Sequence, residues 1–314
     1  MTGALRKQTS KPSKLQILRA SHLSALPWLV HGFSTRVGGF SRAYGKAGLN
    51  LGFTKDDSRA TVERNRAAFL KELGASRLSC GDSRLRLSTR AKLDGEALWP
   101  LITLRQIHSD RIHCVDSVPE EPMAGDGLIT STPGLLLAIQ TADCLPVILV
   151  DAKRHAVGVF HAGWRGTLAR IVEKGVGEMY RHFGTLPRDL KAAIGPGIQG
   201  CCYAVGDEVR MKFESQFAYA ASLFREVKDS DPVREKYPLL FLTARAPGHS
   251  ELPKTIFLDL VEANRRQLLA AGVAKKNIEA LPFCTNCHPE LLFSYRAEKG
   301  KTGRLMGVAG IRAQ

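Results

Sequence analysis

The sequence has no apolar run near the ~20 residues that a membrane-spanning helix needs, so we expect no membrane span. Its N-terminal stretch, MTGALRKQTSKPSKLQ, is basic and lacks the apolar segment of a secretory signal. The seven cysteines are an odd number, and their spacing shows no disulfide framework. These absences argue against an exported, disulfide-stabilised domain, and we expect a cytoplasmic protein.

Motifs for nucleic-acid recognition are also missing. The formal net charge is +15, but Lys and Arg are scattered, and no zinc-finger, RRM or KH pattern occurs. We therefore predict no nucleic-acid partner and interpret the basic residues as a solvated surface.

No internal repeat is visible, and 314 residues allow one large domain or two smaller ones. Residues 74–100 and 213–254 combine polar, Gly-rich or Pro-rich stretches without a core of their own, which is typical of surface insertions. We predict a flexible tail over residues 1–25, followed by a single domain over 26–314, in a monomer.

Short apolar segments alternate with helical patterns along the chain. Helices are predicted over residues 58–74, 167–184 and 258–273 from their apolar spacing, and the first two end in Gly. The mixture predicts an α/β or α+β fold with layered, mixed or antiparallel sheets and helices packed outside. Strands are predicted over residues 101–108, 111–118, 135–142, 147–151, 156–162, 190–196 and 305–311.

The stretch TADCLPVILVD, a short polar turn and AVGVFHA together predict a β-hairpin. If its turn is centred on Ala152 and Lys153, Cys144 and His161 face each other with Cβ atoms ~5 Å apart. That distance suits two ligands of one metal ion. The turn lacks a strong Asn-Gly signature, and a slip of one residue would put the two side chains on opposite faces.

A third ligand is available in His108, which ends another apolar run. His108, Cys144 and His161 would give zinc three protein ligands and leave a fourth position open, as in catalytic sites. Asp143 would then act as a proton shuttle or orient the site. The alternative interpretation is a small buried cysteine and ordinary polar histidines at strand ends.

The stretch HAGWRGT passes from a strand to a helix through two glycines, with Thr167 as the expected N-cap. Backbone N–H groups at this helix start, together with Arg165, predict an anion site. A tight turn with a solvated arginine is the alternative.

Many ordered motifs make the chain resemble the YfiH-like family, also called the laccase-domain or polyphenol-oxidase-like family of purine nucleoside phosphorylases. The resemblance covers about residue 30 to the C-terminus. The motifs are HGFSTRVGGFS, LNLG, VERNR, RQIHSD, GDGLIT, TADCLPVILVD, AVGVFHAGWRGT, IGPGI, CCYAVGDEV, CT and FSYRAEKGKTGR.

The resemblance implies a fold similar to the cytotoxic-necrotising-factor catalytic domain. It also implies zinc on His108, Cys144 and His161. The implied activity is phosphorolysis of adenosine, inosine, guanosine and methylthioadenosine, with adenosine deamination as a further reaction. Copper-dependent phenol oxidation is an older assignment of the family, and some members are linked to editing of peptidoglycan precursors.

The chain departs from the family pattern at several points. Ala297 stands where members carry a second Arg after FSYR, and the two predicted insertions are long. Cys287 and His288 look additional. The stretch CTNCH fits a c-type haem attachment motif, but such attachment needs export. A second zinc on Cys284, Cys287 and His288 lacks a partner pair, and the lone GPGIQG match is a weak dinucleotide-binding signal.

Phosphorolysis needs a held phosphate and a proton for the leaving purine. We predict phosphate between the metal and Arg165, with Arg36 and Arg296 as further cationic groups. Asn50 and Gln106 are predicted to orient the ribose or base, and Asp143 to carry the proton. The alternatives are a copper-dependent phenol oxidase, a cysteine hydrolase or amidase with nucleophilic Cys144, and a non-enzymatic binding module that uses the basic surface.

Overall fold

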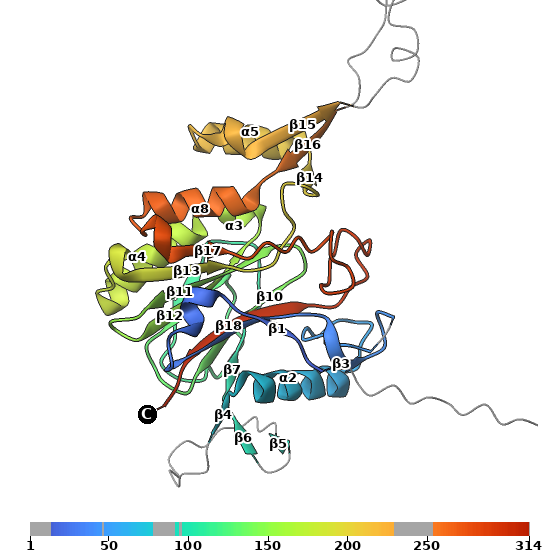
Figure 1. Cartoon of the computed structure of the whole chain (residues 1–314), viewed down its shortest axis with the longest axis vertical. Helices are drawn as coiled ribbons and strands as arrows, with labels where there is room; N and C mark the ends of the chain where they lie inside the picture. Colours follow the sequence, from blue (N-terminus) through green and yellow to red (C-terminus); the bar gives the residue numbers. More distant parts are fainter. Residues whose placement is uncertain (1–13, 46, 78–91, 94–95, 229–253, 314) are drawn as a thin grey trace, which may run out of the picture.

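Two large β-sheets lie face to face between outer helices in the computed structural model (Figure 1). The structure describes residues 14–313 except 46, 78–91, 94–95 and 229–253. The prediction of mixed sheets flanked by helices is confirmed, whereas the likeness to the cytotoxic-necrotising-factor domain stays a prediction. Among the described residues, no helix combines the length and apolarity needed to cross a membrane.

The first sheet is covered on its outer face by helix α2 (Arg59–Leu73). Phe69 and Leu70 of this helix belong to one apolar cluster with Ala138 and Val308 of the sheet. Ser58 caps the start of α2 by accepting the N–H of Thr61, and Gly74 ends it in the left-handed region. The strand order is β1 (Ile17–Leu18), β2 (Leu29–Ser34), β18 (Leu305–Ile311), β10 (Leu136–Thr141) and β7 (Leu101–Ile102).

The second sheet is buried on both faces. Val147 and Leu149 pack towards helices α4 (Ile171–Phe183) and α8 (Leu260–Ala270), while Ile148 and Val150 pack towards the first sheet. These four residues belong to β11 (Leu145–Asp151), and burial on both faces explains why this strand is a continuous apolar run. The order is β17 (Ile278–Ala280), β13 (Leu190–Ile194), β11 (Leu145–Asp151), β12 (Ala156–Ala162), β9 (Gly127–Thr130) and β8 (Ile112–Cys114).

Two smaller sheets extend from this core. One has the order β14 (Ala204–Val205), β16 (Lys254–Leu258), β15 (Phe224–Lys228), and the other β4 (Ser76–Arg77), β6 (Glu96–Leu98), β5 (Lys92–Leu93). They lie near opposite ends of the molecule in Figure 1. The strands β4, β5 and β6 lie within the predicted insertion over 74–100. Of the other small sheet, β15 lies within the predicted insertion over 213–254, whereas β14 and most of β16 lie outside it. Parts of both predicted insertions fall outside the described residues.

The remaining short elements connect these layers. They are α1 (Ser21–Ser24), β3 (Val37–Ser41), α3 (Trp164–Leu168), α5 (Asp207–Gln216) and the 3-10 helices Pro187–Asp189, Ala220–Leu223 and Lys275–Asn277.

The structure corrects the predicted tail over residues 1–25. Residues 1–13 lie outside the described part, but β1 pairs with β2, and Ala20 and Leu23 are fully buried in the core between the sheets. The sequence pattern missed this segment because it holds only a few apolar residues in a polar context.

Two predicted elements are shorter in the structure. The strand over 101–108 covers only Leu101–Ile102, because the following residues leave the sheet. The helix over 167–184 is divided by Arg170, whose φ of 63° separates α3 from α4. Thr167 is therefore not an N-cap: Gly163 precedes α3, and Thr167 is buried inside that helix, where it accepts a hydrogen bond from Asn264.

Candidate metal centre

The β11–β12 hairpin brings Cys144 and His161 together in a register that differs from the predicted one. Pro146, not Cys144, pairs with His161, so the predicted direct pairing is wrong. The turn is longer than expected because the Asp151 carboxylate accepts the N–H groups of Lys153 and Arg154. The shift is an even number of residues, so Cys144 keeps the same face as Pro146 and is a diagonal neighbour of His161.

His108 joins this pair from the loop after β7. The possible ligand atoms of His108, Cys144 and His161 all lie within 4.8 Å of one another. The two imidazole rings meet edge to face, with centroids 4.8 Å apart. His161 is buried and His108 is exposed, so the cluster opens to solvent on the His108 side. We call these three residues the His/Cys site.

Asp126 bonds the side chain of His161 and the backbone of His108, and the sequence analysis gave it no role. Its carboxylate, which is fully buried, accepts a hydrogen bond from Nδ1 of His161 at 2.8 Å and from the backbone N–H of His108 at 3.0 Å. The N–H groups of Ile107 and Ser109 also donate to it. The motif GDGLIT was the available signal, because an acid before a buried strand needs partners.

Backbone geometry also shapes the site. His108 has a φ of 58°, in the left-handed region, and the three N–H donors to Asp126 stabilise that turn. Gly163 lies against the thiol, because a Cβ there would stand 2.8 Å from Sγ of Cys144 and 3.4 Å from Cδ2 of His108. A side chain at position 163 would therefore displace the site.

The electrostatics of the site favour a charged thiolate. Burial raises the pKa of Cys144, but the positive charge of His161 and hydrogen bonds from His108 and His161 outweigh it, so the pKa is lowered. For His161, burial lowers the pKa, and the charge of Cys144 and the bond to Asp126 raise it overall. Burial likewise raises the pKa of Asp126, but hydrogen bonds from His161 and Ser109 lower it to about 2.

Asp143 acts on the backbone around Cys144. Its carboxylate accepts hydrogen bonds from Thr285 Oγ1 at 2.6 Å, Ser294 Oγ at 2.7 Å and the N–H of Arg296 at 2.7 Å. Its φ of 92° is unfavourable for a non-Gly residue. These bonds hold the strained residue before Cys144, and they occupy oxygens that a proton carrier would need.

Arg165 and Arg296 are both exposed at the rim of the site. The guanidinium of Arg165 stacks over Trp164 at 4.3 Å, and that of Arg296 lies 5.6 Å from the ring of Tyr203. Burial raises the pKa of Tyr203. The charges of Cys144 and Asp143 raise it further, and those of Arg296 and Arg165 lower it. Tyr203 is thus a rim residue that the sequence analysis missed, although it lies in the motif CCYAVGDEV.

The side chains of the other three predicted substrate-binding residues bond other groups of the protein. Arg36 donates to the carbonyls of Pro289 and Tyr44 and pairs with Glu298. Asn50 is fully buried, and its amide bonds Gly52, Asp57 and Arg304.

Gln106 exchanges two hydrogen bonds with the backbone of Gln140, one through each atom of its amide. The side chains of Arg36, Asn50 and Gln106 thus already have protein partners, and their roles in substrate binding stay predictions.

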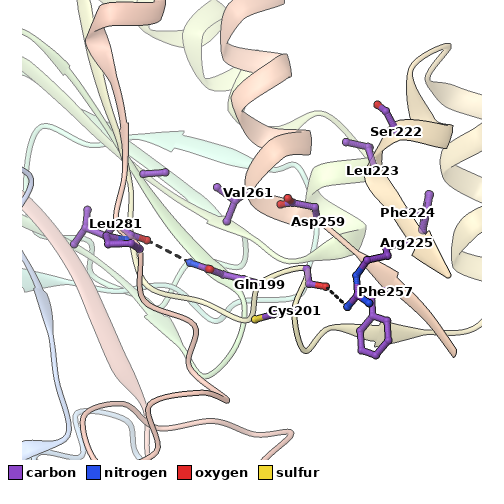
Figure 2. Close-up of a pocket in the computed structure, with 13 residues that line it drawn as sticks. Gln199, Cys201, Ser222, Leu223, Phe224, Arg225, Phe257, Asp259, Val261 and Leu281 are labelled. Carbon is purple, nitrogen blue, oxygen red and sulfur yellow. Dashed lines mark hydrogen bonds between the residues drawn. The ribbon is translucent and has the colours of Figure 1, made fainter. Parts of the chain in front are cut away.

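Two pockets lie in the described part of the chain, and neither is lined by His108, Cys144 or His161. One, of about 400 Å³, is lined by Arg165, Trp164 and Lys212. The other, of about 550 Å³, lies beside the loop after β13 and is shown in Figure 2. Gln199 on that loop donates to the carbonyl of Leu281 (Figure 2). We place the candidate chemistry at the His/Cys site, because neither pocket gathers nucleophilic and basic groups as that site does.

The donor set fits a metal ion. Two imidazole nitrogens and one thiolate are preferred zinc ligands, and three of them leave a coordination position open. The bond from His161 Nδ1 to Asp126 leaves Nε2 free to ligate, which is the usual carboxylate support of a metal-bound histidine. The buried carboxylate of Asp126, which already bonds Nδ1 of His161, is the structural observation that supports metal binding.

Two curated proteins are similar to this chain over most of its length. The purine nucleoside phosphorylase of Deinococcus radiodurans is 35% identical over 298 residues, 95% of this chain and 93% of that protein. Adenosine deaminase RL5, from an unknown prokaryotic organism, is 33% identical over 74% of this chain and 82% of its own length.

A solved structure has the same fold. YlmD from Geobacillus stearothermophilus aligns with a TM-score of 0.69 at 30% identity, covering 92% of this chain and 93% of that one. The family model described as "Multi-copper polyphenol oxidoreductase laccase" matches residues 30–312. The chain therefore belongs to the laccase-domain family, together with the YfiH- and YlmD-like proteins.

Proposed function

We propose that this protein is a zinc-dependent purine nucleoside phosphorylase that acts on adenosine, inosine, guanosine and methylthioadenosine and also deaminates adenosine. The observation that carries the proposal is the convergence of His108, Cys144 and His161 within 4.8 Å, backed by the buried Asp126. The names of the two curated relatives supply the reaction types.

Zinc, when bound, would supply a Lewis acid with one open coordination position. In phosphorolysis a phosphate oxygen forms a bond to C1′ of the nucleoside, the bond from C1′ to the purine nitrogen breaks, and the purine takes up a proton. Arg165 and Arg296 are the exposed guanidinium groups at the rim that would hold the phosphate. Positioning two reactants in this way removes much of the entropic barrier.

Asp126 and Asp143 support different parts of the His/Cys site. Asp126 orients His161 and the loop of His108, while Asp143 fixes the backbone that carries Cys144. Asp143 is thus better placed as a positioning residue than as the proton carrier. Tyr203, near Arg165 and Arg296, is the added candidate for contact with the nucleoside.

The proposal is tested with the purified, zinc-loaded full chain. Inosine and inorganic phosphate should yield hypoxanthine and ribose 1-phosphate in equal amounts, and adenosine without phosphate should yield inosine and ammonia. The matched control is Cys114→Ser, which alters an exposed cysteine outside the His/Cys site. A folded, zinc-loaded protein without turnover on any purine nucleoside would overturn the proposal.

A cysteine hydrolase or amidase is a second candidate, favoured by the same geometry. Cys144 bonds His161, and His161 bonds Asp126, which is the order of a nucleophile, a base and an orienting acid. Alkylation by iodoacetamide separates the two functions. A metal-bound thiolate should resist alkylation until a chelator is added, whereas a free nucleophile should react at once and lose activity.

The description of the matched family model also favours a copper-dependent phenol oxidase. One thiolate and two imidazoles can bind copper as well as zinc. Oxygen uptake with a phenol in the presence of one equivalent of copper would support that function. Its absence, together with phosphorolysis, would support the main proposal.

A further inference from the structure

A second cluster of metal-ligand type lies outside the His/Cys site. The sulfur atoms of Cys201, Cys202, Cys284 and Cys287 all lie within 4.8 Å of one another. We propose that these four residues, the four-cysteine cluster, form a closed structural zinc site that fastens two loops of the molecule together. This proposal does not depend on the proposed function.

The fold explains how two distant segments meet. Cys201 and Cys202 follow β13, and Cys284 and Cys287 follow β17. The strands β13 and β17 are parallel neighbours, so the loops that leave them emerge at the same edge of the sheet. An isolated bridge joins Gly197 to Cys284, and the N–H of Thr285 donates to the carbonyl of Gly197.

The sulfur positions suit a tetrahedral ion. With Zn–S bonds of about 2.3 Å, the sulfurs of a tetrathiolate site are about 3.8 Å apart. The distance from Cys202 Sγ to Cys287 Sγ is 3.3 Å, and that from Cys201 Sγ to Cys287 Sγ is 3.6 Å. Both distances exceed the ~2.05 Å of a disulfide bond, and a disulfide would leave the other two sulfurs without a role.

Solvent access also fits a metal. Cys201 and Cys287 are exposed, and Cys201 lies at the edge of the pocket in Figure 2, so an ion can enter from solvent.

Four thiolate ligands leave no open position, so the site is structural. His288, considered earlier as a ligand, instead bonds the carbonyl of Cys284. The sequence analysis found no second pair of ligands to complete a zinc site at Cys284 and Cys287. Cys201 and Cys202 supply that pair.

The cluster adjoins the backbone around Asp143. Thr285 follows Cys284 and donates to the Asp143 carboxylate, and the N–H of Ile198 donates to the carbonyl of Asp143. Tyr203 follows Cys202 directly. A metal here would hold the two loops that contact the strained residue before Cys144, and so stabilise the rim of the His/Cys site.

Elemental analysis of the full chain, purified with a reductant, tests the proposal. We expect about two zinc ions per wild-type chain, and about one in both Cys201→Ser/Cys287→Ser and His108→Ala. The Cys114→Ser control should keep about two. The cobalt-substituted His108→Ala variant should retain the intense sulfur-to-metal absorption of a tetrathiolate site, and the double variant should show only the weaker absorption of the single-thiolate site.

The wild-type chain gives a second readout that needs no variant. Iodoacetamide followed by mass spectrometry should modify Cys114 at once and the four clustered cysteines only after a chelator is added. Unchanged metal content in the double variant, immediate alkylation of the four cysteines, or a disulfide between Cys202 and Cys287 in the native chain would overturn the proposal. Loss of zinc from His108→Ala alone would bear on the His/Cys site only.

Discussion

The two metal-ligand clusters differ in what holds their side chains. In the His/Cys site, Cys144 directly precedes β11, His161 lies within the neighbouring strand β12, and Asp126 bonds His161 and the backbone of His108. In the four-cysteine cluster, every ligand lies on a loop, and one backbone bridge joins the two segments. The fold holds the side chains of the first site, which would leave one coordination position open on a metal, whereas a metal in the second would fasten two loops together.

Removal of a metal ligand should give the largest loss of activity, and the loss should differ between the two clusters. Cys144→Ser should lower inosine phosphorolysis by at least ~100-fold, because the loss of a ligand should exceed the 10- to 100-fold typical of supporting residues. The Cys201→Ser/Cys287→Ser variant should lose far less activity, because its ligands only support the rim. Equal losses in the two variants would contradict the assignment of a catalytic and a structural site. Steady-state kinetics with matched zinc analysis measures both.

Substitution of Asp126 tests the pre-organisation of the His/Cys site. Asp126→Asn should weaken zinc binding there by ~10- to 100-fold, because the amide supports His161 less well than the carboxylate does. Zinc bound by the four-cysteine cluster should not change. Competition with a chromophoric chelator measures both affinities. An unchanged affinity at the His/Cys site would mean that Asp126 does not orient the ligands.

A single methyl group at position 163 should act through sterics. Gly163→Ala places a Cβ about 2.8 Å from Sγ of Cys144, so zinc affinity should fall by roughly tenfold or more, as it does when the support of a ligand is disturbed. The matched control is Gly177→Ala in α4, where a Cβ meets nothing within 4 Å. That variant should keep its zinc and gain up to ~1 kcal/mol in the free energy of unfolding. Similar zinc affinities in the two variants would contradict the close approach.

Loss of metal at low pH must be distinguished from unfolding of the chain. His31 is a buried residue that should make the free energy of unfolding fall at low pH. Burial lowers the pKa of this core residue to about 4, from about 6.5 in the unfolded chain. A lowered histidine pKa means that the stabilising contribution is complete above pH 6.5 and is lost as the pH falls towards 4. The loss is up to ~3.5 kcal/mol, from ~1.4 kcal/mol for each pKa unit.

Urea unfolding at several pH values measures this contribution. His31→Gln should flatten the dependence between pH 6.5 and 4. A variant as pH-sensitive as the wild type would show that other groups cause the loss.

The sequence predicted most of the core because burial leaves a strong pattern. The strands over 147–151, 156–162 and 305–311 and the helix over 58–74 occur nearly as predicted. The helix boundary at Arg170 was missed, since a non-Gly residue in the left-handed region carries no clear signal. The buried segment around Ala20 and Leu23 was missed because its contacts are long-range.

The His/Cys site was predictable only in part. The ligand trio followed from the residues and from the family resemblance, but the register was wrong because the Asp151 side chain lengthens the turn. Asp126 was missed, since its partners lie on two other segments. The four-cysteine cluster could not be predicted from spacing: only the parallel pairing of β13 with β17 brings Cys201 and Cys202 beside the C-x-x-C pair.

The most direct test of the central claim is the rate of inosine phosphorolysis as zinc is restored stepwise to the metal-free full chain. We expect hypoxanthine release to rise in proportion to occupancy of the site formed by His108, Cys144 and His161, and to stop rising when that site is full. Full phosphorolysis by a folded chain without metal would contradict the account.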